Sequence, residues 1–178
     1  MNGALLRGAV AGLAGTAAMS AAMSVAKAAG LMAGEWPPRK VGRESQKAAG
    51  VHGALSRPAF EAGWVAQHFA YGAGAGAAYE LIQSRLKLRE PAPAGPLFGT
   101  ALWALSYVGW LPAAGLYPPP HAEPARRVGT MVVAHLVYGT TTAEVARRLR
   151  PRPDGARGGR KGSARRTPDR LEGARLSY

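Results

Sequence analysis

The sequence contains no cysteine and has few acidic residues. Without cysteine the chain cannot form disulfides, cysteine-ligated zinc sites or iron–sulfur clusters, and it lacks a thiol nucleophile. Its 10 acidic residues are outnumbered by 23 lysines and arginines, so the formal net charge is +13 over 178 residues. A chain of this length is enough for one ordinary domain or for a few membrane spans.

Charged residues are also missing from four long stretches, at residues 8–26, 62–79, 91–120 and 128–143. A helix rises about 1.5 Å per residue, so roughly 18–20 residues cross the hydrocarbon core of a bilayer. A soluble bundle of Ala/Gly helices shows similar runs, but four of them would leave too little polar surface to cover them. The sequence therefore predicts an all-α, polytopic membrane protein with a compact bundle of transmembrane helices at about residues 6–32, 62–84, 96–117 and 126–149. A cleaved signal peptide is the alternative for the first stretch, although its apolar run exceeds the usual 7–15 residues.

Lysine and arginine are distributed unequally between the two predicted sides of the membrane. The N-terminus, the loop after the second span and the C-terminal stretch together carry 15 of these residues, against 7 in the other two loops. The positive-inside rule then places both termini in the cytoplasm. The longest loop on the outer side, at about residues 34–61, is either a helix lying at the membrane interface or an irregular loop.

The chain divides into a transmembrane domain at residues 1–150 and a tail at residues 151–178. The tail is rich in Arg, Gly, Pro and Ser and has no apolar periodicity, so we expect it to be disordered and cytoplasmic. Its positive charge favours contact with anionic lipid head groups. Binding of nucleic acid is disfavoured because no aromatic side chain stands within the basic run to stack on bases.

Small residues recur with the four-residue spacing that brings two membrane helices into close contact. The pairs are Gly8/Gly12, Ala11/Gly15, Gly30/Gly34, Gly72/Gly76 and Gly95/Gly99. Lipid gives no hydrophobic drive for helix association, so close approach of backbones at small residues provides the packing. We expect packing at Gly8, Gly12, Gly72, Gly76 and Gly139, within one chain, a homo-oligomer or a larger membrane complex.

The two halves of the chain repeat one order of short motifs. An Ala-Ala-Gly-Leu block at residues 28–31 or 113–116 is followed by two prolines and then by a His-x-x-Tyr-Gly block at residues 68–72 or 135–139. Each block occupies the same place relative to its predicted helices. A duplicated two-helix unit would produce this order, with a pseudo-two-fold axis along the membrane normal.

The His-x-x-Tyr-Gly blocks supply the candidate polar site within the membrane, formed by His68, Tyr71, His135 and Tyr138. Residues three apart share one helix face, so each His lies on the same face as its Tyr. Three roles remain open for the histidines. They can form hydrogen bonds with neighbouring helices, line a path for protons or a solute, or ligate haem as a bis-histidine pair. No metal site is expected, and no cofactor is expected beyond the haem alternative.

The sequence contains no nucleophile–base signature, phosphate-binding loop or His-Glu-x-x-His motif, so we predict no catalytic residue and no enzymatic activity. The run Gly72–Gly76 resembles a dinucleotide loop only superficially, because no strand precedes it. Glu144 can pair with Arg148 four residues later. Glu80 has no such neighbour, so it is either solvated or paired with another helix.

Taken together, these features resemble the YagU-like family of small bacterial inner-membrane proteins. The resemblance rests on the Gly-rich first helix, the Trp36-Pro37-Pro38 turn, the two His-x-x-Tyr-Gly blocks and the Leu-Pro-Ala-Ala-Gly-Leu segment at residues 111–116. It covers about residues 3–149 and leaves out the basic tail. It implies about four helices and a multi-pass location in the bacterial inner membrane, and it supplies no activity, cofactor or catalytic residue. The expected function is that of a structural or accessory subunit, with a small transport or channel protein as the alternative.

Overall fold

The computed structural model describes residues 2–86 and 91–151, and these are helical with no strand among them. Four long helical segments dominate: α1 (Asn2–Ala28), α3 (Arg57–Leu86), α4 (Pro91–Trp103) and α6 (Ala125–Leu149). The π-helix η2 (Ala104–Trp110) prolongs α4 into α5 (Leu111–Ala113), with a kink at Gly109. The all-α prediction is confirmed. Most of the predicted tail, residues 152–178, lies outside the described residues.

The connections at the α2 end contain three short helices, α2 (Pro37–Ala48), η1 (His52–Ala54) and η3 (Pro120–Ala122). The structure therefore has a helix in part of residues 34–61, and its position at a membrane interface stays a prediction. Pro37 and Pro38 occupy the first turn of α2, where proline is favoured because its missing N–H has no partner there in any helix.

The two Ala-Ala-Gly-Leu blocks are helix ends. Gly30 and Gly115 have φ values of +72° and +68°, which lie in the left-handed region that glycine adopts at low cost. In each block the N–H of the following leucine donates to a carbonyl five residues earlier, at 2.9 Å. Gly34 also has a positive φ, of +80°, so the predicted Gly30/Gly34 pair lies in a turn rather than at a helix contact. The motif therefore reflects how both helices terminate.

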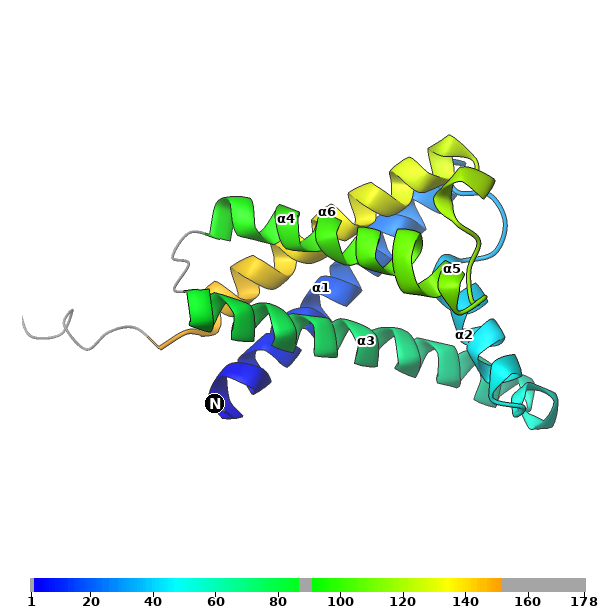
Figure 1. The fold of residues 1–178 in the computed structure, drawn as a ribbon, viewed down its shortest axis with the longest axis horizontal. Helices are drawn as coiled ribbons and strands as arrows, with labels where there is room; N and C mark the ends of the chain where they lie inside the picture. Colours follow the sequence, from blue (N-terminus) through cyan, green and yellow to red (C-terminus); the bar gives the residue numbers. More distant parts are fainter. Residues whose placement is uncertain (1, 87–90, 152–178) are drawn as a thin grey trace, which may run out of the picture.

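The long helices lie in the order α3, α1, α6, α4, because α1 packs against α3 and α6 while α4 packs against α6. The start of α1, the end of α3, the start of α4 and the end of α6 lie at one end of the molecule, on the left in Figure 1. Helices α2 and α5 lie at the other end. Each long segment therefore runs the length of the bundle, and neighbours in the chain run in opposite directions.

Glycines mark the closest approaches within two helix pairs. In the pair of α1 and α3, a methyl group added at Gly76 would overlap the Gly8 carbonyl and the Gly12 Cα atom. In the pair of α4 and α6, a methyl group at Gly139 would overlap the backbone of Gly95 and Gly99. The spaces at Gly8, Gly12 and Gly72 are filled in the same way by backbone or side-chain atoms of the partner helix. The predicted packing glycines thus lie where the helices meet.

Large apolar side chains lie on the outside of the bundle, and several polar ones lie inside. Leu6, Val25 and Leu97 are 67–70% exposed. The buried polar side chains are Thr16, Glu80, Gln83, Ser106, Arg127, His135 and Thr142. Among the described residues one helix, α1, is long and apolar enough to span a membrane on length and composition alone.

Candidate functional site

A pocket of about 110 Å³ lies in the half of the bundle next to α2. Its wall comes from α1, α2, α3, η2, α5 and α6, and it carries no lysine, arginine, aspartate or glutamate. The lining residues are Met19, Met23, Pro38, Val41, Gln67, His68, Tyr71, Ser106, Tyr107, Trp110, Leu111, Met131 and His135. The pocket is therefore mostly apolar, with a few convergent polar groups, as is typical of small-molecule sites.

Both histidines of the repeated motif line this pocket. His68 on α3 places its Nε2 atom 3.4 Å from the Ser20 hydroxyl of α1. His135 on α6 places its Nδ1 atom 2.8 Å from the Met131 carbonyl of its own helix. Because a carbonyl only accepts, Nδ1 of His135 carries the proton, and in the neutral ring Nε2 is an acceptor.

The two tyrosines of the motif have different surroundings. Tyr71 is 41% exposed and its hydroxyl lies 2.8 Å from the Ser106 hydroxyl, at the edge of the pocket. Tyr138 is 1% exposed and its hydroxyl donates to the Gly72 carbonyl at 2.7 Å. The structure therefore gathers His68, Tyr71 and His135 around one pocket. Tyr138 instead joins α6 to α3 on the side of the pocket that faces away from α2.

The π-helix η2 contributes pocket residues that the sequence did not indicate, namely Ser106, Tyr107 and Trp110. A π-helix is rare, and it often occurs at functional sites because the extra residue per turn changes the direction of the side chains. The Tyr107 ring lies edge-on to the His135 ring, with centroids 5.7 Å apart. Gly109 has the non-helical values φ −96° and ψ −106°, and this glycine within an apolar run is the one local sign in the sequence.

Aromatic side chains fill the bundle on the side of the pocket that faces away from α2, toward the start of α1 and the end of α6. The Phe98 ring of α4 lies 5.0 Å from the Tyr79 ring of α3 and 6.5 Å from the Tyr138 ring of α6. Tyr79 and Tyr138 are 3% and 1% exposed. Beyond this layer, toward the end that holds the start of α1 and the end of α6, the helices approach closely at Gly8, Gly76 and Gly139.

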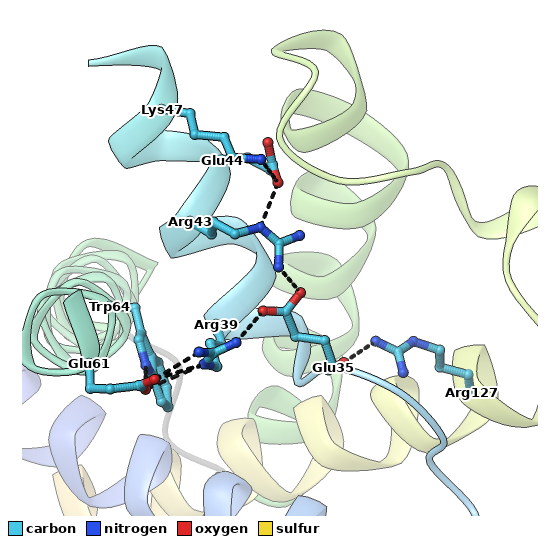
Figure 2. A network of polar contacts seen from close by, with 8 residues as sticks. All are labelled: Glu35, Arg39, Arg43, Glu44, Lys47, Glu61, Trp64 and Arg127. Atoms are coloured by element: carbon cyan, nitrogen blue, oxygen red, sulfur yellow. Dashed lines mark hydrogen bonds and ion pairs between the residues drawn. The ribbon is translucent and has the colours of Figure 1, made fainter. Parts of the chain in front are cut away.

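Helix α2 covers the other end of the pocket through Pro38 and Val41. Figure 2 shows the charged network that holds it. Arg39 donates to Glu61 of α3 at 2.8 Å and to Glu35 at 2.7 Å. The Arg39 hydrogen bond, followed by that of Trp64, holds the pKa of the Glu61 carboxyl below its usual range.

Arg127 ties the connection between α1 and α2 to helix α6. Its guanidinium is buried and donates to the carbonyls of Ala33 at 2.5 Å and Glu35 at 2.6 Å. It also pairs with Glu123 at 2.5 Å, which balances the buried charge. These contacts fix where α2 begins, and hence where Pro38 and Val41 meet the pocket.

A second group of ion pairs lies at the opposite end. Glu80 is 2% exposed and pairs with Arg150 at 2.7 Å and with Arg7 at 3.5 Å. Of the two alternatives for Glu80, the structure therefore has pairing with other segments. Glu144 bonds Arg148 at 2.6 Å as predicted, and also Arg147 at 2.6 Å.

The haem alternative does not fit the pocket in this form. Its two histidines do line one space, but about 110 Å³ is below the roughly 300 Å³ at which drug-sized ligand sites begin, and a porphyrin is larger than that. Within the described ranges, no three His, Asp or Glu side chains lie together as a metal site would require.

The model of one protein family matches residues 2–157, a range that includes every helix described above. The match covers most of the chain, and its description is a family of unknown function, DUF6789. The chain belongs to this family. No curated protein and no solved structure matches it. The likeness to the YagU-like family stays a prediction, because none of these findings connects the two.

Proposed function

We propose that this member of DUF6789 is a non-enzymatic protein of the bacterial inner membrane, with both termini in the cytoplasm. Helices α1, α3 and α6 and the continuous segment from α4 to α5 would each cross the bilayer. The protein would have a structural or accessory role. It would act as a single chain, as a homo-oligomer or as a subunit of a larger membrane complex. The repeated motifs and the two glycine-packed pairs support a duplicated two-helix unit as its origin.

The observation that carries the proposal is the placement of apolar and polar side chains. Large apolar residues from α1, η2 and α6 are more than half exposed, including Val25, Leu105 and Val133. A water-soluble bundle would bury such side chains, each with a gain of about 1.5–3 kcal/mol. Exposing these side chains to the acyl chains of lipid carries no hydrophobic penalty. The interior of the bundle can instead be packed by small residues and by residues that form hydrogen bonds.

The charged groups support the same orientation. Arg7, Glu80 and Arg150 form ion pairs at the end that holds the termini, and the α2 network lies at the other end. Trp36 and Trp64 also lie near α2, and tryptophan is enriched at membrane interfaces. Most lysines and arginines fall on the side of the termini, as the positive-inside rule requires for the cytoplasm.

A transport role is the second candidate, because His68 and His135 line one pocket. It would require the layer of Phe98, Tyr79 and Tyr138 to open toward the cytoplasmic side. Purified protein in liposomes tests this role by proton or solute flux. Flux that the double variant His68→Ala, His135→Ala abolishes would favour transport over the accessory role, and equal flux in both proteins would exclude it.

The membrane proposal is tested by extraction and by topology reporters. The protein should stay in the membrane pellet after carbonate washing. A fluorescent reporter that matures only in the cytoplasm should be bright after Arg150, and a phosphatase active only in the periplasm should be active after Val51. As matched controls, the fluorescent reporter is fused after Val51 and the phosphatase after Arg150, and both should then be inactive. Release by carbonate, or the reversed reporter pattern, would refute the proposal.

A further inference from the structure

We infer that the pocket between the two helix pairs binds the uncharged, hydroxyl-bearing ring of an amphiphile dissolved in the bilayer. This inference rests on the proposed function, since the ligand would reach the pocket from lipid. It goes further by assigning the pocket a ligand class and by assigning the recognition of that ligand to His135 and Tyr107.

The polar groups of the wall set the chemistry of the ligand. His135 is 8% exposed, and its Nδ1 proton is committed to the Met131 carbonyl. Its Nε2 atom is then an acceptor, and it has no hydrogen-bond partner among the described residues. Tyr107 is 7% exposed, and its hydroxyl likewise makes no hydrogen bond within the described part of the chain. A hydroxyl can donate to Nε2 of His135 and accept from Tyr107, whereas a carbonyl can only accept.

The lack of permanently charged side chains in the wall disfavours ionised ligands. Burying an ionised carboxylate or ammonium without a partner costs far more than burying a neutral hydroxyl that forms hydrogen bonds. No lysine, arginine, aspartate or glutamate lines the pocket, so it offers no permanently charged partner for an ionised head group. A neutral phenol or cyclic alcohol meets this condition.

The size and softness of the wall favour a single ring. An apolar cavity of about 150 Å³ accommodates benzene, so a pocket of about 110 Å³ has room for one six-membered ring after small adjustments. Met19, Met23 and Met131 supply such adjustments, because their flexible thioethers adapt to irregular shapes and make favourable contacts with aromatic rings.

The way in would lie between α3 and η2, where the hydrogen bond between Tyr71 and Ser106 must open to let the ring pass. Tyr71 and Trp110 line the pocket, are 41% and 38% exposed, and have ring centroids 6.0 Å apart. Beside them, Leu105 and Val108 of η2 are 65% and 59% exposed. Under the proposed topology this outer surface faces acyl chains, so the ring can enter from the bilayer while an attached chain remains in lipid.

The test compares ligands that differ in one hydroxyl. The full chain is reconstituted in lipid nanodiscs and titrated with 4-octylphenol or octylbenzene, with binding followed by tryptophan fluorescence. One buried hydrogen bond corresponds to about tenfold in affinity, so 4-octylphenol should bind about tenfold more tightly. Equal binding of the two probes would overturn the inference.

Two variants identify the groups that recognise the hydroxyl. His135→Leu and Tyr107→Phe should each remove most of the preference for 4-octylphenol while leaving the affinity for octylbenzene similar. Tyr79→Phe is the matched control, because Tyr79 is a buried tyrosine outside the pocket and its variant should keep the preference. A preference that survives in both pocket variants, or one lost equally in the control, would overturn the inference. Because the readout is a ratio of two probes, a general loss of stability does not imitate it.

The source of the ligand is tested by adding phenol from the aqueous phase. If 4-octylphenol binds and excess phenol displaces it, the inference is supported. If phenol binds and 4-octylphenol does not, entry of the ligand from the bilayer is refuted. Flotation of the same purified protein after reconstitution into liposomes separates the two proposals. Failure to float refutes the membrane location, whereas protein that floats without preferring the phenol refutes this inference alone.

Discussion

Helices α1 and α3 form one antiparallel pair and α4 and α6 form another, and both use facing glycines for contact. The pairs also share the His-x-x-Tyr-Gly motif, yet its side chains differ in burial. His135 and Tyr138 are 8% and 1% exposed, whereas Tyr71 is 41% exposed. The cause is position in the bundle, because α6 packs between α1 and α4 while α3 lies at an edge.

The same sequence motif therefore has different roles on α3 and α6, because the two helices pack differently in the bundle. Each motif tyrosine reaches the other pair: Tyr71 meets Ser106 of η2, and Tyr138 meets the carbonyl of Gly72 on α3. The buried bond of Tyr138 joins the pairs below the pocket, and the exposed contact of Tyr71 forms its edge.

The largest expected effect comes from the glycine contacts. Gly76→Leu and Gly139→Leu should each destabilise the bundle by about 3 kcal/mol or more, because backbone atoms of the partner helix occupy the space. Thermal unfolding in detergent measures this effect. Gly74→Leu is the control, since a Cβ atom there meets nothing within 4 Å. Tolerance of the change in one pair alone would show that the pairs are not equivalent.

The next effect concerns Glu80, which joins α3 to the segment after α6. Glu80→Gln should cost about 2 kcal/mol of unfolding free energy, below the 3–5 kcal/mol of a fully buried pair because Arg7 and Arg150 are partly exposed. Denaturant or thermal unfolding gives the value. Glu144→Gln, whose partners are exposed, should change stability little. Equal losses in the two variants would contradict the assignment.

A smaller effect separates the two motif tyrosines. Tyr138→Phe should lose about 1 kcal/mol, because the buried Gly72 carbonyl loses its side-chain donor. Tyr71→Phe should lose less, since water can replace the bond at an exposed site. Matched thermal unfolding of both variants measures the difference. The reverse order would show that the exposed tyrosine carries more of the contact between the pairs.

The smallest effect is a pH-dependent loosening of α2. The pKa of Glu61 is lower in the folded protein than in the unfolded chain, because Arg39 and Trp64 bond its carboxylate. The bond therefore contributes fully above the ordinary glutamate pKa of about 4.3 and is lost as the pH falls through the folded value. Trp64 fluorescence should change below about pH 4. The variant Glu61→Gln should flatten this change. An unaltered titration in that variant would assign the change to Glu44, whose pKa is lowered by its hydrogen bond with Arg43.

Much of the architecture could be predicted from the sequence. The uncharged stretches located the long helices, and the spacing of Gly8, Gly12, Gly72 and Gly76 located a contact, because close backbone approach admits few residue types. The motif histidines were candidates because ionisable groups are rare in such stretches. The interpretation of Gly30/Gly34 as a packing pair was wrong, since a helix end uses the same glycines for positive φ.

The part of the site on η2 could not be predicted. Ser106 and Tyr107 stand in an apolar run with no polar periodicity, and a π-helix has no distinct local pattern. Pairing of Glu80 with Arg7 and Arg150 was equally hidden, because these residues are 73 and 70 positions apart from it. Long-range contacts of this kind depend on helix order rather than on local spacing.

The sequence alone determined the helical class, the approximate positions of the long helices and the small residues at their contacts, because these follow from local periodicity and side-chain size. It also determined that two histidine motifs exist. The tertiary structure decided which of those side chains share a space. It placed α6 at the centre and α3 at the edge, gave η2 its π-helical geometry, and set α2 over the pocket. Each of these depends on how whole helices pack, and no single stretch of sequence contains that information.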